Sequence, residues 1–281
     1  MTPALTLFAL VAFAANSVLC RLALGHGAAD PATFTLIRIA SGAVVLALIN
    51  AAKSRGREGT APRVTAIPWV SAALLFLYAA PFSFAYISLG AGTGALILFA
   101  CVQATMLAAA TGAGERFRWM EAAGLLIALA GLAYLVVPGL SAPSPLGSAL
   151  MAMAGISWGL YSLRGRSSTD PVRDTAKNFI LATPLAVFLS AIALKGARVS
   201  PSGLLLAVAS GALASGLGYV AWYAALRSLT RIRAATVQLT VPVLAAAAGV
   251  VLIGETVTLR LVLSAILILG GVGLALAGRA R

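Results

Sequence analysis

The side chains whose type and spacing could do chemistry are aromatic rings and amides that lie inside long apolar runs. Three of these runs carry aromatic stripes at helical spacing, namely Tyr78, Phe82 and Tyr86, then Trp158 and Tyr161, and then Tyr219, Trp222 and Tyr223. Amides occur at Asn16, Gln103 and Gln238, and Phe99 shares a helical face with Gln103. Because polar groups at such depth usually face a cavity or another helix, the pattern predicts a central, uncharged cavity with aromatic walls.

Two other interpretations of these residues stay open. Any single ring could be a packing residue or part of an interfacial aromatic belt. Asn16 and Gln103 could instead join neighbouring helices through hydrogen bonds, since small residues surround both amides. The set as a whole favours a cavity, because three runs that should be neighbours each carry a stripe.

Helix breakers stand beside these stripes. Pro81 lies within the first stripe, Gly216 and Gly218 precede the third, and Pro242 follows Gln238. Proline removes a backbone hydrogen bond and glycine loosens a helix, so these four positions are predicted hinges. Replacing Gly216 and Gly218 by Leu should slow a hinge motion while the protein stays folded.

Groups needed for catalysis or proton coupling are scarce. With one histidine, no HExxH motif and no paired acidic residues deep in a run, the sequence predicts no enzyme, no metal and no cofactor. None of the 7 acidic residues lies near the middle of a run, so the carboxylate typical of proton-driven antiporters is missing. Arg38, inside the second run, is the strongest candidate for binding an anion, and replacing it by Ala would separate an anion carrier from a zwitterion carrier.

The elements that must position these groups are membrane-spanning helices. Hydrophobic residues make up 61% of the 281 residues and charged residues 10%, whereas soluble domains are roughly 45–50% apolar and about 25% charged. The mean hydropathy is +1.01. The apolar runs and their breakers predict an all-α membrane protein with ten spans, near residues 4–24, 31–52, 67–89, 92–112, 119–138, 145–164, 174–195, 202–226, 233–253 and 259–278.

Basic residues indicate the orientation of these spans. Most of the 20 Lys and Arg fall on the side of the amino terminus, as in KSRGREGTAPR at 53–63. The positive-inside rule then places both termini in the cytoplasm, as expected for a multi-pass protein of a bacterial inner membrane. The same placement accounts for the net charge of +13 without a nucleic-acid partner. The expected partners are lipid and a small molecule, and the expected state is a monomer.

An internal repeat divides the chain. A shift of 140 residues sets Gly114-Glu115 on Gly254-Glu255, each pair being followed by a Gly-rich run. This divides the chain into residues 1–140 and 141–281. Because each half holds five spans, an odd number, the second half must enter the membrane inverted. The two glutamates are expected to cap the helix that follows or to pair with the nearby Arg116 and Arg260.

The repeated pattern of an apolar helix ending in Gly-Glu, a short loop and a Gly-rich helix resembles the EamA repeat of the drug/metabolite transporter superfamily. It occurs in residues 94–136 and again in 234–277, where Pro242 precedes Gly254 as is typical of the family. The first copy departs from the pattern, with Val102 at the matching place.

The resemblance implies a ten-helix exporter of small metabolites whose fifth and tenth helices are peripheral. The aromatic spans are most similar to those of aromatic-amino-acid exporters of the YddG type, which implies amino-acid export by alternating access. The missing carboxylate favours uniport. Export of nucleosides, sugar phosphates or cationic drugs, and proton-coupled antiport, are the alternatives.

Overall fold

Helices make up the regular structure of this computed structural model, which describes residues 2–54, 68–112, 119–137, 142–165, 168–226, 228–229 and 237–280. The first half holds α1 (Thr2–Gly25), α2 (Pro31–Ser54), α3 (Pro68–Ala85), α4 (Ala91–Gly112) and α5 (Trp119–Val136). The second half holds α6 (Pro145–Gly165), α7 (Pro171–Ile192), η1 (Leu194–Gly196), α8 (Pro201–Val208), η2 (Ala209–Leu217), α9 (Gly218–Leu226), α11 (Thr240–Ala248), η3 (Gly249–Ile253) and α12 (Leu259–Ala280). The predicted all-helical class is confirmed.

A shared local signal starts four of the described helices: an Asp or Ser whose side chain caps the helix, followed by proline. The pairs are Asp30-Pro31, Ser144-Pro145, Asp170-Pro171 and Ser200-Pro201. In each, the cap oxygen accepts a hydrogen bond from the backbone N–H three residues later, at 2.9 to 3.3 Å. The cap satisfies an N–H that the first turn leaves free, and proline has no N–H there to satisfy. Short sequence motifs therefore fix where these helices begin.

The helix from Pro201 to Leu226 is continuous but widens in its middle. Its central segment η2 is a π-helix, a form often found at functional sites. There Gly211 lets the backbone approach α2 closely, since a Cβ at this position would lie 2.1 Å from the carbonyl oxygen of Arg38. A second π segment, η3, extends α11 and ends at Gly254, whose left-handed φ of 73° suits glycine.

The lengths and surface of these helices indicate a membrane setting. Within the described residues, six helices are long and apolar enough to cross a membrane. Shorter apolar helices occupy Trp69–Ala85, Ala91–Met106, Thr240–Ile253 and Leu259–Ala275, inside other predicted spans. Large apolar side chains point outward, with Trp119 77% and Val251 78% exposed, which suits contact with lipid. The chain is a multi-pass membrane protein, while the count of ten spans stays a prediction.

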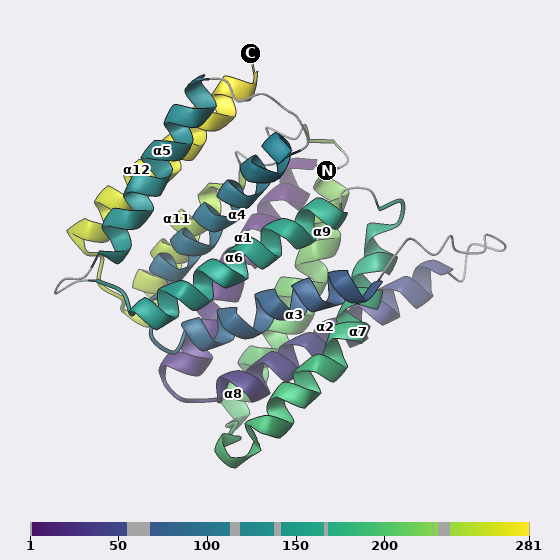
Figure 1. Cartoon of the computed structure of the whole chain (residues 1–281). Helices are drawn as coiled ribbons and strands as arrows, with labels where there is room; N and C mark the ends of the chain where they lie inside the picture. Colours follow the sequence, from purple (N-terminus) through teal and green to yellow (C-terminus); the bar gives the residue numbers. More distant parts are fainter. Residues whose placement is uncertain are drawn as a thin grey trace.

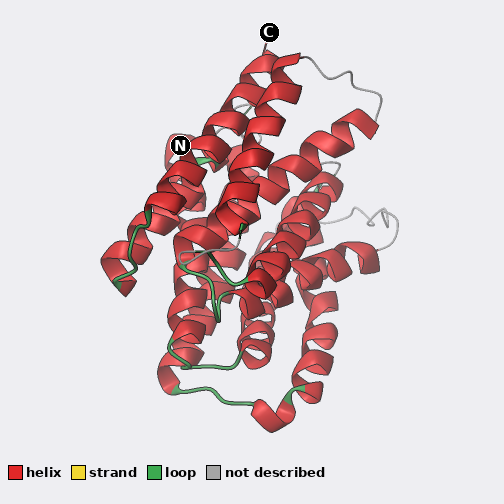
Figure 2. Ribbon diagram, turned by 60° about the vertical axis from the view of Figure 1, so that its left-hand side comes forward, coloured by secondary structure: helices red, strands yellow, loops and turns green. Residues whose placement is uncertain are grey.

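The helices are arranged so that the two halves interleave. α5 and α12 lie side by side at one edge of the bundle, and α2 packs on α7 away from them (Figure 1). Between these pairs, α1, α3, α4, α6 and α9 form the interior. The two termini lie toward the same end in both ribbon views (Figures 1 and 2).

Candidate functional site

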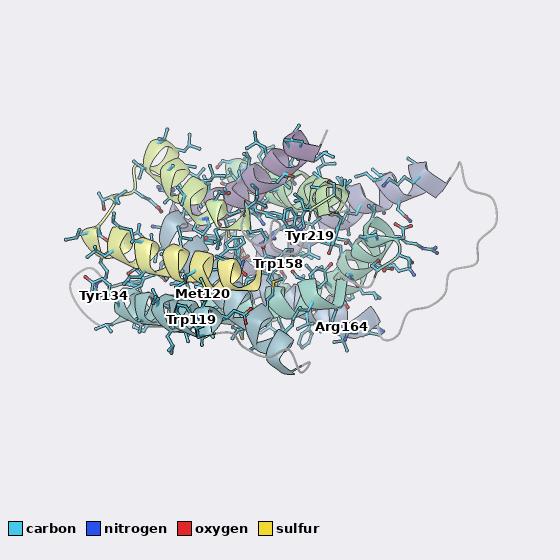
Figure 3. The ribbon with its side chains drawn as sticks, turned by 90° about the horizontal axis from the view of Figure 1, so that it is seen from above. Trp119, Met120, Tyr134, Trp158, Arg164 and Tyr219 are labelled. Atoms are coloured by element: carbon cyan, nitrogen blue, oxygen red, sulfur yellow. The ribbon has the colours of Figure 1, made fainter. Side chains whose placement is uncertain are left out.

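Three aromatic stripes meet at Trp158 of α6. Its ring centroid lies 4.9 Å from that of Tyr78 in α3 and 5.0 Å from that of Tyr219 in α9. Tyr161 is 5.5 Å away on the same helix as Trp158. These separations are typical of favourable ring contacts. Trp158 and Tyr219 lie in the interior of the bundle, far from the edge that carries Tyr134 and Trp119 (Figure 3).

A ring from α1 completes this group. Phe13 meets Trp158 edge-on at 6.3 Å, Tyr219 at 6.0 Å and Trp222 at 5.7 Å. The sequence prediction omitted Phe13, although it precedes Asn16 by three residues and therefore shares a face of α1 with that amide. We refer to Phe13, Tyr78, Phe82, Trp158 and Tyr219 as the central cluster.

The stripe on α3 continues from the central cluster toward the end of its helix. Phe82 lies 5.4 Å from Tyr78 and 4.8 Å from Tyr86. The Tyr86 hydroxyl donates to the carbonyl oxygen of Ala91 at the start of α4. Tyr86 is therefore fixed at the α3–α4 turn, at the edge of the site.

Asn16 lies at the polar centre of the site. Its side-chain N–H groups donate to the Tyr78 hydroxyl at 3.4 Å and to the Ser215 hydroxyl at 3.5 Å. Its carbonyl oxygen accepts a hydrogen bond from the hydroxyl of Ser210. Both serines belong to η2, so the π segment supplies hydroxyls from the second half to an amide and a phenol of the first.

Arg38 of α2 also lies in this centre, which corrects the expectation of an uncharged site. It is 2% exposed, and its Nη2 donates to the Tyr78 hydroxyl at 2.8 Å while its Nε donates to Ser215 at 3.4 Å. The guanidinium lies 5.1 Å from the ring centroid of Tyr78 and 4.8 Å from that of Phe82, within the range of cation–π attraction. The sequence places Arg38 within a predicted span, but it does not show which neighbouring helices the side chain faces.

Some predicted site residues lie elsewhere. Gln103 faces the peripheral pair, where it lines a cavity of about 10 Å³ between α4, α5 and α12. Phe99 is buried one turn earlier on α4, and Gln238 is buried just before α11. The hydroxyl of Tyr223 lies beside Gly165 at the end of α6. Tyr161, although next to Trp158, uses its hydroxyl to accept a hydrogen bond from Asn178.

The four predicted hinge residues occupy different settings. Pro81 lies inside α3 and Gly216 inside η2. Pro242 lies in the first turn of α11, where a missing N–H removes no helical hydrogen bond. A Cβ on Gly218 would lie 2.9 Å from Ala12, so Leu would clash there, whereas the nearest atoms to a Cβ on Gly216 are 3.4 Å away. The double Leu variant would therefore disturb packing as well as any hinge.

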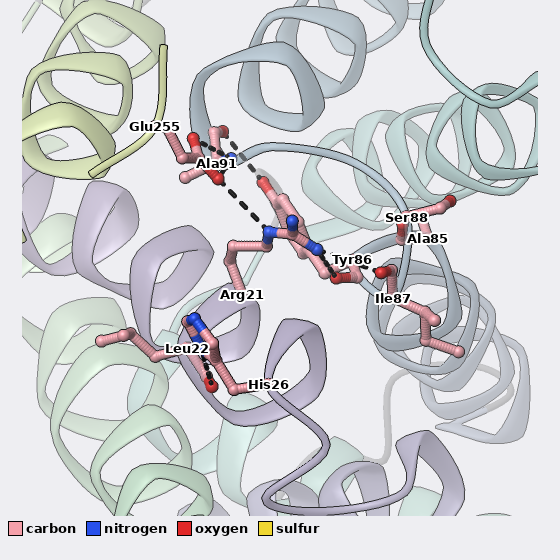
Figure 4. Close-up of polar contacts among 9 residues, drawn as sticks. All are labelled: Arg21, Leu22, His26, Ala85, Tyr86, Ile87, Ser88, Ala91 and Glu255. Carbon is pink, nitrogen blue, oxygen red and sulfur yellow. Dashed lines mark hydrogen bonds and ion pairs between the residues drawn. The ribbon is translucent and has the colours of Figure 1, made fainter. Parts of the chain in front are cut away.

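At the end of the bundle away from the termini, an ion pair joins the two halves. Nε of Arg21 lies 3.3 Å from a carboxylate oxygen of Glu255 (Figure 4). Arg21 also donates to the carbonyl oxygens of Tyr86 and Ile87 at the end of the α3 chain segment. Glu255 accepts from the backbone N–H of Ala91 at 2.9 Å and so caps α4. These side chains border a cavity of about 440 Å³.

The expected roles of the repeated glutamates need correction. Glu255 caps a helix of the other half rather than the helix that follows it, and its ionic partner is Arg21. Arg260 instead donates to the carbonyl oxygen of Val137 and lies over the ring of Tyr134. Glu115 and Arg116 lie outside the described residues.

Another repeat signal escaped the sequence prediction. Asp30-Pro31 and Asp170-Pro171 are separated by the same 140 residues as the two Gly-Glu pairs. Both aspartates cap the following helix through the N–H three residues later. The two halves therefore share a capped helix start as well as a glutamate motif.

Comparisons with known proteins agree with this architecture. Residues 145–277 match the EamA-like transporter family. An uncharacterized protein of Pseudomonas aeruginosa is 48% identical over 275 residues, covering 98% of this chain and 94% of the relative. The chain belongs to the EamA-like transporter family. The family resemblance seen in the sequence is thereby confirmed, and this EamA-like chain is a membrane transporter rather than an enzyme.

Two further relatives extend the comparison. An uncharacterized transporter of Archaeoglobus fulgidus is 29% identical over 163 residues, which cover 56% of the EamA-like chain and 58% of that transporter. A protein of known crystal structure superposes with a TM-score of 0.67 at 23% identity, covering 97% of this chain and 95% of that one. The crystal structure shows a shared fold and says nothing about substrate.

Proposed function

We propose that this EamA-like transporter exports small metabolites by alternating access, with amino acids, including aromatic ones, as its substrates. The observation that carries the proposal is the ring of Trp158, which contacts Tyr78 of the first half and Tyr219 of the second. Carriers built from inverted repeats bind substrate at the interface of their halves. The rings would hold an apolar side chain, and Asn16 with the η2 hydroxyls would hold polar ends.

The way the helices pair supports two inverted five-span halves, residues 1–140 and 141–281. α6 packs on α3 and α4 of the first half, while α1 packs on the α8–α9 helix and on α11 of the second half. In the proposed repeat, α1 corresponds to α6, α3 to the α8–α9 helix and α4 to α11. Under this correspondence the contact of α6 with α3 matches that of α1 with α8–α9, and the contact of α6 with α4 matches that of α1 with α11. α5 pairs with its own counterpart α12, and α2 with α7. Such reciprocity is expected of halves related by a two-fold axis.

Contacts at the end away from the termini fit one closed gate of such a carrier. The ion pair of Arg21 with Glu255 crosses between the halves. The backbone N–H of Asp30 donates to the carbonyl oxygen of Arg198, and the backbone N–H of Arg198 donates to the carboxylate of Asp30. These two bonds join the α1–α2 turn to the segment before α8. In our proposal these contacts break when substrate leaves through this end.

The surroundings of the centre favour uniport. Within the described residues, the groups that bond or stack with Arg38 are hydroxyls and aromatic rings. A proton-coupled carrier would be expected to place a titratable carboxylate at this depth. We therefore propose transport down the gradient of the substrate, by a monomer.

We also propose that the end holding both termini is cytoplasmic. Lys53 and Arg164, at the ends of α2 and α6, lie in the last turns of their helices, where the positive-inside rule expects basic residues. Fusing a periplasm-active phosphatase or a cytoplasm-fluorescent reporter to the carboxyl terminus checks this. Phosphatase activity would contradict the orientation.

Transport itself can be tested in proteoliposomes loaded with unlabelled phenylalanine. Labelled phenylalanine outside should accumulate by counterflow, at a rate unchanged by a pH gradient. Strict dependence on that gradient would remove uniport from the proposal. Absence of counterflow for every amino acid, with flux of another metabolite, would remove the amino-acid assignment.

A further inference from the structure

Arg38 carries a buried positive charge that the described residues do not neutralise. Nη2 and Nε have hydroxyl partners, but Nη1 has no hydrogen-bond partner. The two rings beside the guanidinium and the hydroxyls of Tyr78 and Ser215 offer dipoles and π-faces, not a negative charge. In the described part of the chain, no carboxylate lies within salt-bridge distance of Arg38.

Such a charge is costly in the middle of an apolar bundle. An unpaired buried ion loses its hydration, and ionisable groups inside membranes usually mark a path or site for a charged ligand. Dipoles and rings offset part of that cost and leave the net charge in place. Arg38 is therefore a position where an incoming anion would gain a counter-charge already stripped of water.

A second donor nearby also lacks a partner. The hydroxyl of Tyr219 is buried and has no hydrogen-bond partner. Ser215, four residues earlier on the same continuous helix, accepts a hydrogen bond from Nε of Arg38 at 3.4 Å. Arg38 and Tyr219 come from different halves of the chain, on α2 and α9. Both belong to the surroundings of Trp158, through Tyr78 on one side and by direct ring contact on the other.

We infer that Arg38 and Tyr219 together bind the carboxylate of the transported molecule, whose apolar part lies against the rings of the central cluster. This inference rests on the proposed transport function and names the substrate class of that site. One guanidinium balances one negative charge, which favours a monocarboxylate over a phosphate dianion. A planar guanidinium also matches the two oxygens of a carboxylate.

A carboxylate site at Arg38 predicts a selectivity that amino-acid export alone does not predict. Among the described residues at this centre, an α-ammonium group would meet rings, hydroxyls and the amide of Asn16. A carboxylic acid without an ammonium group should therefore bind at least as well as the matching amino acid. An amine without a carboxylate should bind poorly, because it would face the charge of Arg38.

The test uses the full chain in lipid nanodiscs and four probes with the same ring: 3-phenylpropionate, phenylalanine, phenethylamine and phenyl phosphate. Binding is read from the fluorescence of tryptophan and from ligand-induced thermal shift. We expect 3-phenylpropionate and phenylalanine to bind, and phenethylamine to bind at least tenfold more weakly. Arg38→Gln should weaken 3-phenylpropionate at least tenfold and abolish the preference over phenethylamine.

Matched variants separate a ligand role from a structural one. Arg260→Gln removes an arginine that also stacks on a tyrosine, but at the peripheral pair, and should change affinity less than twofold. Arg38→Lys keeps the charge and loses the planar fork, so it should retain the preference for the acid with reduced affinity. Tyr219→Phe removes one hydroxyl and should weaken the binding of 3-phenylpropionate severalfold. This variant tests the same site if Arg38→Gln does not fold.

The outcomes that overturn the inference are specific. Equal binding of phenethylamine and 3-phenylpropionate, no binding of either carboxylate, or unchanged affinity in Arg38→Gln would each remove the carboxylate site. Tighter binding of phenyl phosphate would reassign the site to phosphate esters. Binding of 3-phenylpropionate without amino-acid flux would contradict amino-acid export but not the carboxylate site. Amino-acid flux that Arg38→Gln leaves unchanged would contradict the carboxylate site but not amino-acid export.

Discussion

The central cluster and the α5–α12 pair are held together by different physics. In the centre, rings from four helices meet around Trp158, and hydroxyls, an amide and Arg38 share hydrogen bonds. At the edge, backbones touch directly: a Cβ on Gly124 would lie 2.4 Å from the carbonyl oxygen of Gly271, and one on Gly271 would lie 2.5 Å from that of Gly124. Small residues allow this approach, which is how helices associate in lipid.

This difference suggests that the central cluster binds substrate, whereas the α5–α12 pair stabilises the fold. Hydrogen bonds of 3.4 and 3.5 Å and unpaired donors can rearrange when a ligand arrives. Close backbone packing leaves no space for an alternative arrangement. We therefore expect changes at the centre to alter transport, and changes at the edge to alter stability without altering the site.

The largest effect should come from closing the gap at Gly211. Gly211→Ala would place a methyl group 2.1 Å from the Arg38 carbonyl oxygen and from the Ser41 hydroxyl, so α2 and η2 must separate. Overpacking of this kind should cost about 3 kcal/mol and remove transport. Gly216→Ala in the same segment, with its nearest neighbours 3.4 Å away, is the control. Thermal unfolding in detergent and counterflow measure both, and equal melting temperatures would show that the α2–η2 contact does not matter.

The next largest effect is expected where α5 packs on α12. Gly271→Ala should cost about 2 kcal/mol, because its methyl group meets the backbone of α5. Flux per folded molecule should stay within twofold of the unmodified chain. Gly270→Ala, whose Cβ has no neighbour within 4 Å, should be neutral or slightly stabilising. Flux lost together with stability would mean that the peripheral pair also shapes the site.

A smaller effect concerns the proposed gate, formed by the ion pair of Arg21 with Glu255. Glu255→Gln removes the ion pair with Arg21 and weakens the cap of α4, which should cost about 1 kcal/mol. Because the closed end loses a contact, the open form should gain population and be labelled faster. The rate at which a thiol reagent labels a Thr93→Cys variant, with the new cysteine lining the cavity, measures this. Labelling that is unchanged would show that the pair does not hold the gate.

The smallest effect should depend on pH. Burial acts to raise the pKa of Asp30, but hydrogen bonds from Thr33, Ala32 and Arg198 outweigh it and lower that pKa below its ordinary value. The carboxylate therefore stabilises the fold above the unfolded pKa of about 3.9, and this contribution is lost as the pH falls through the lower folded pKa. Asp30→Asn should melt below the unmodified chain at pH 7 and converge with it in acid. A gap that does not narrow at all as the pH falls below the unfolded pKa would contradict this.

Much of the architecture could be predicted because it depends on short windows of sequence. Apolar runs of about 20 residues mark spans, and Asp-Pro or Ser-Pro pairs mark where helices such as α2 and α8 begin. The stripe of Tyr78 and Phe82 follows from helical spacing alone. The Gly-Glu repeat predicted the family, and the Asp-Pro repeat could have strengthened it.

The candidate site was harder to predict, because it depends on how each helix is rotated against distant ones. Gln103 and Asn16 are both amides inside apolar runs of the sequence. In the structure, Gln103 faces the α5–α12 pair, whereas Asn16 faces the central cluster. Glu255 has Arg260 nearby in the chain but finds Arg21 across the bundle.

The sequence alone determined that this chain crosses a membrane several times and carries aromatic helix faces, because hydrophobicity and helical periodicity are properties of neighbouring residues. Only the tertiary structure decided that the faces meet at Trp158 and that the centre is charged. The direction of Arg38 depends on packing between α2, α3 and η2, whose residues lie up to 177 positions apart. No local pattern encodes which side of a helix a distant partner will cover.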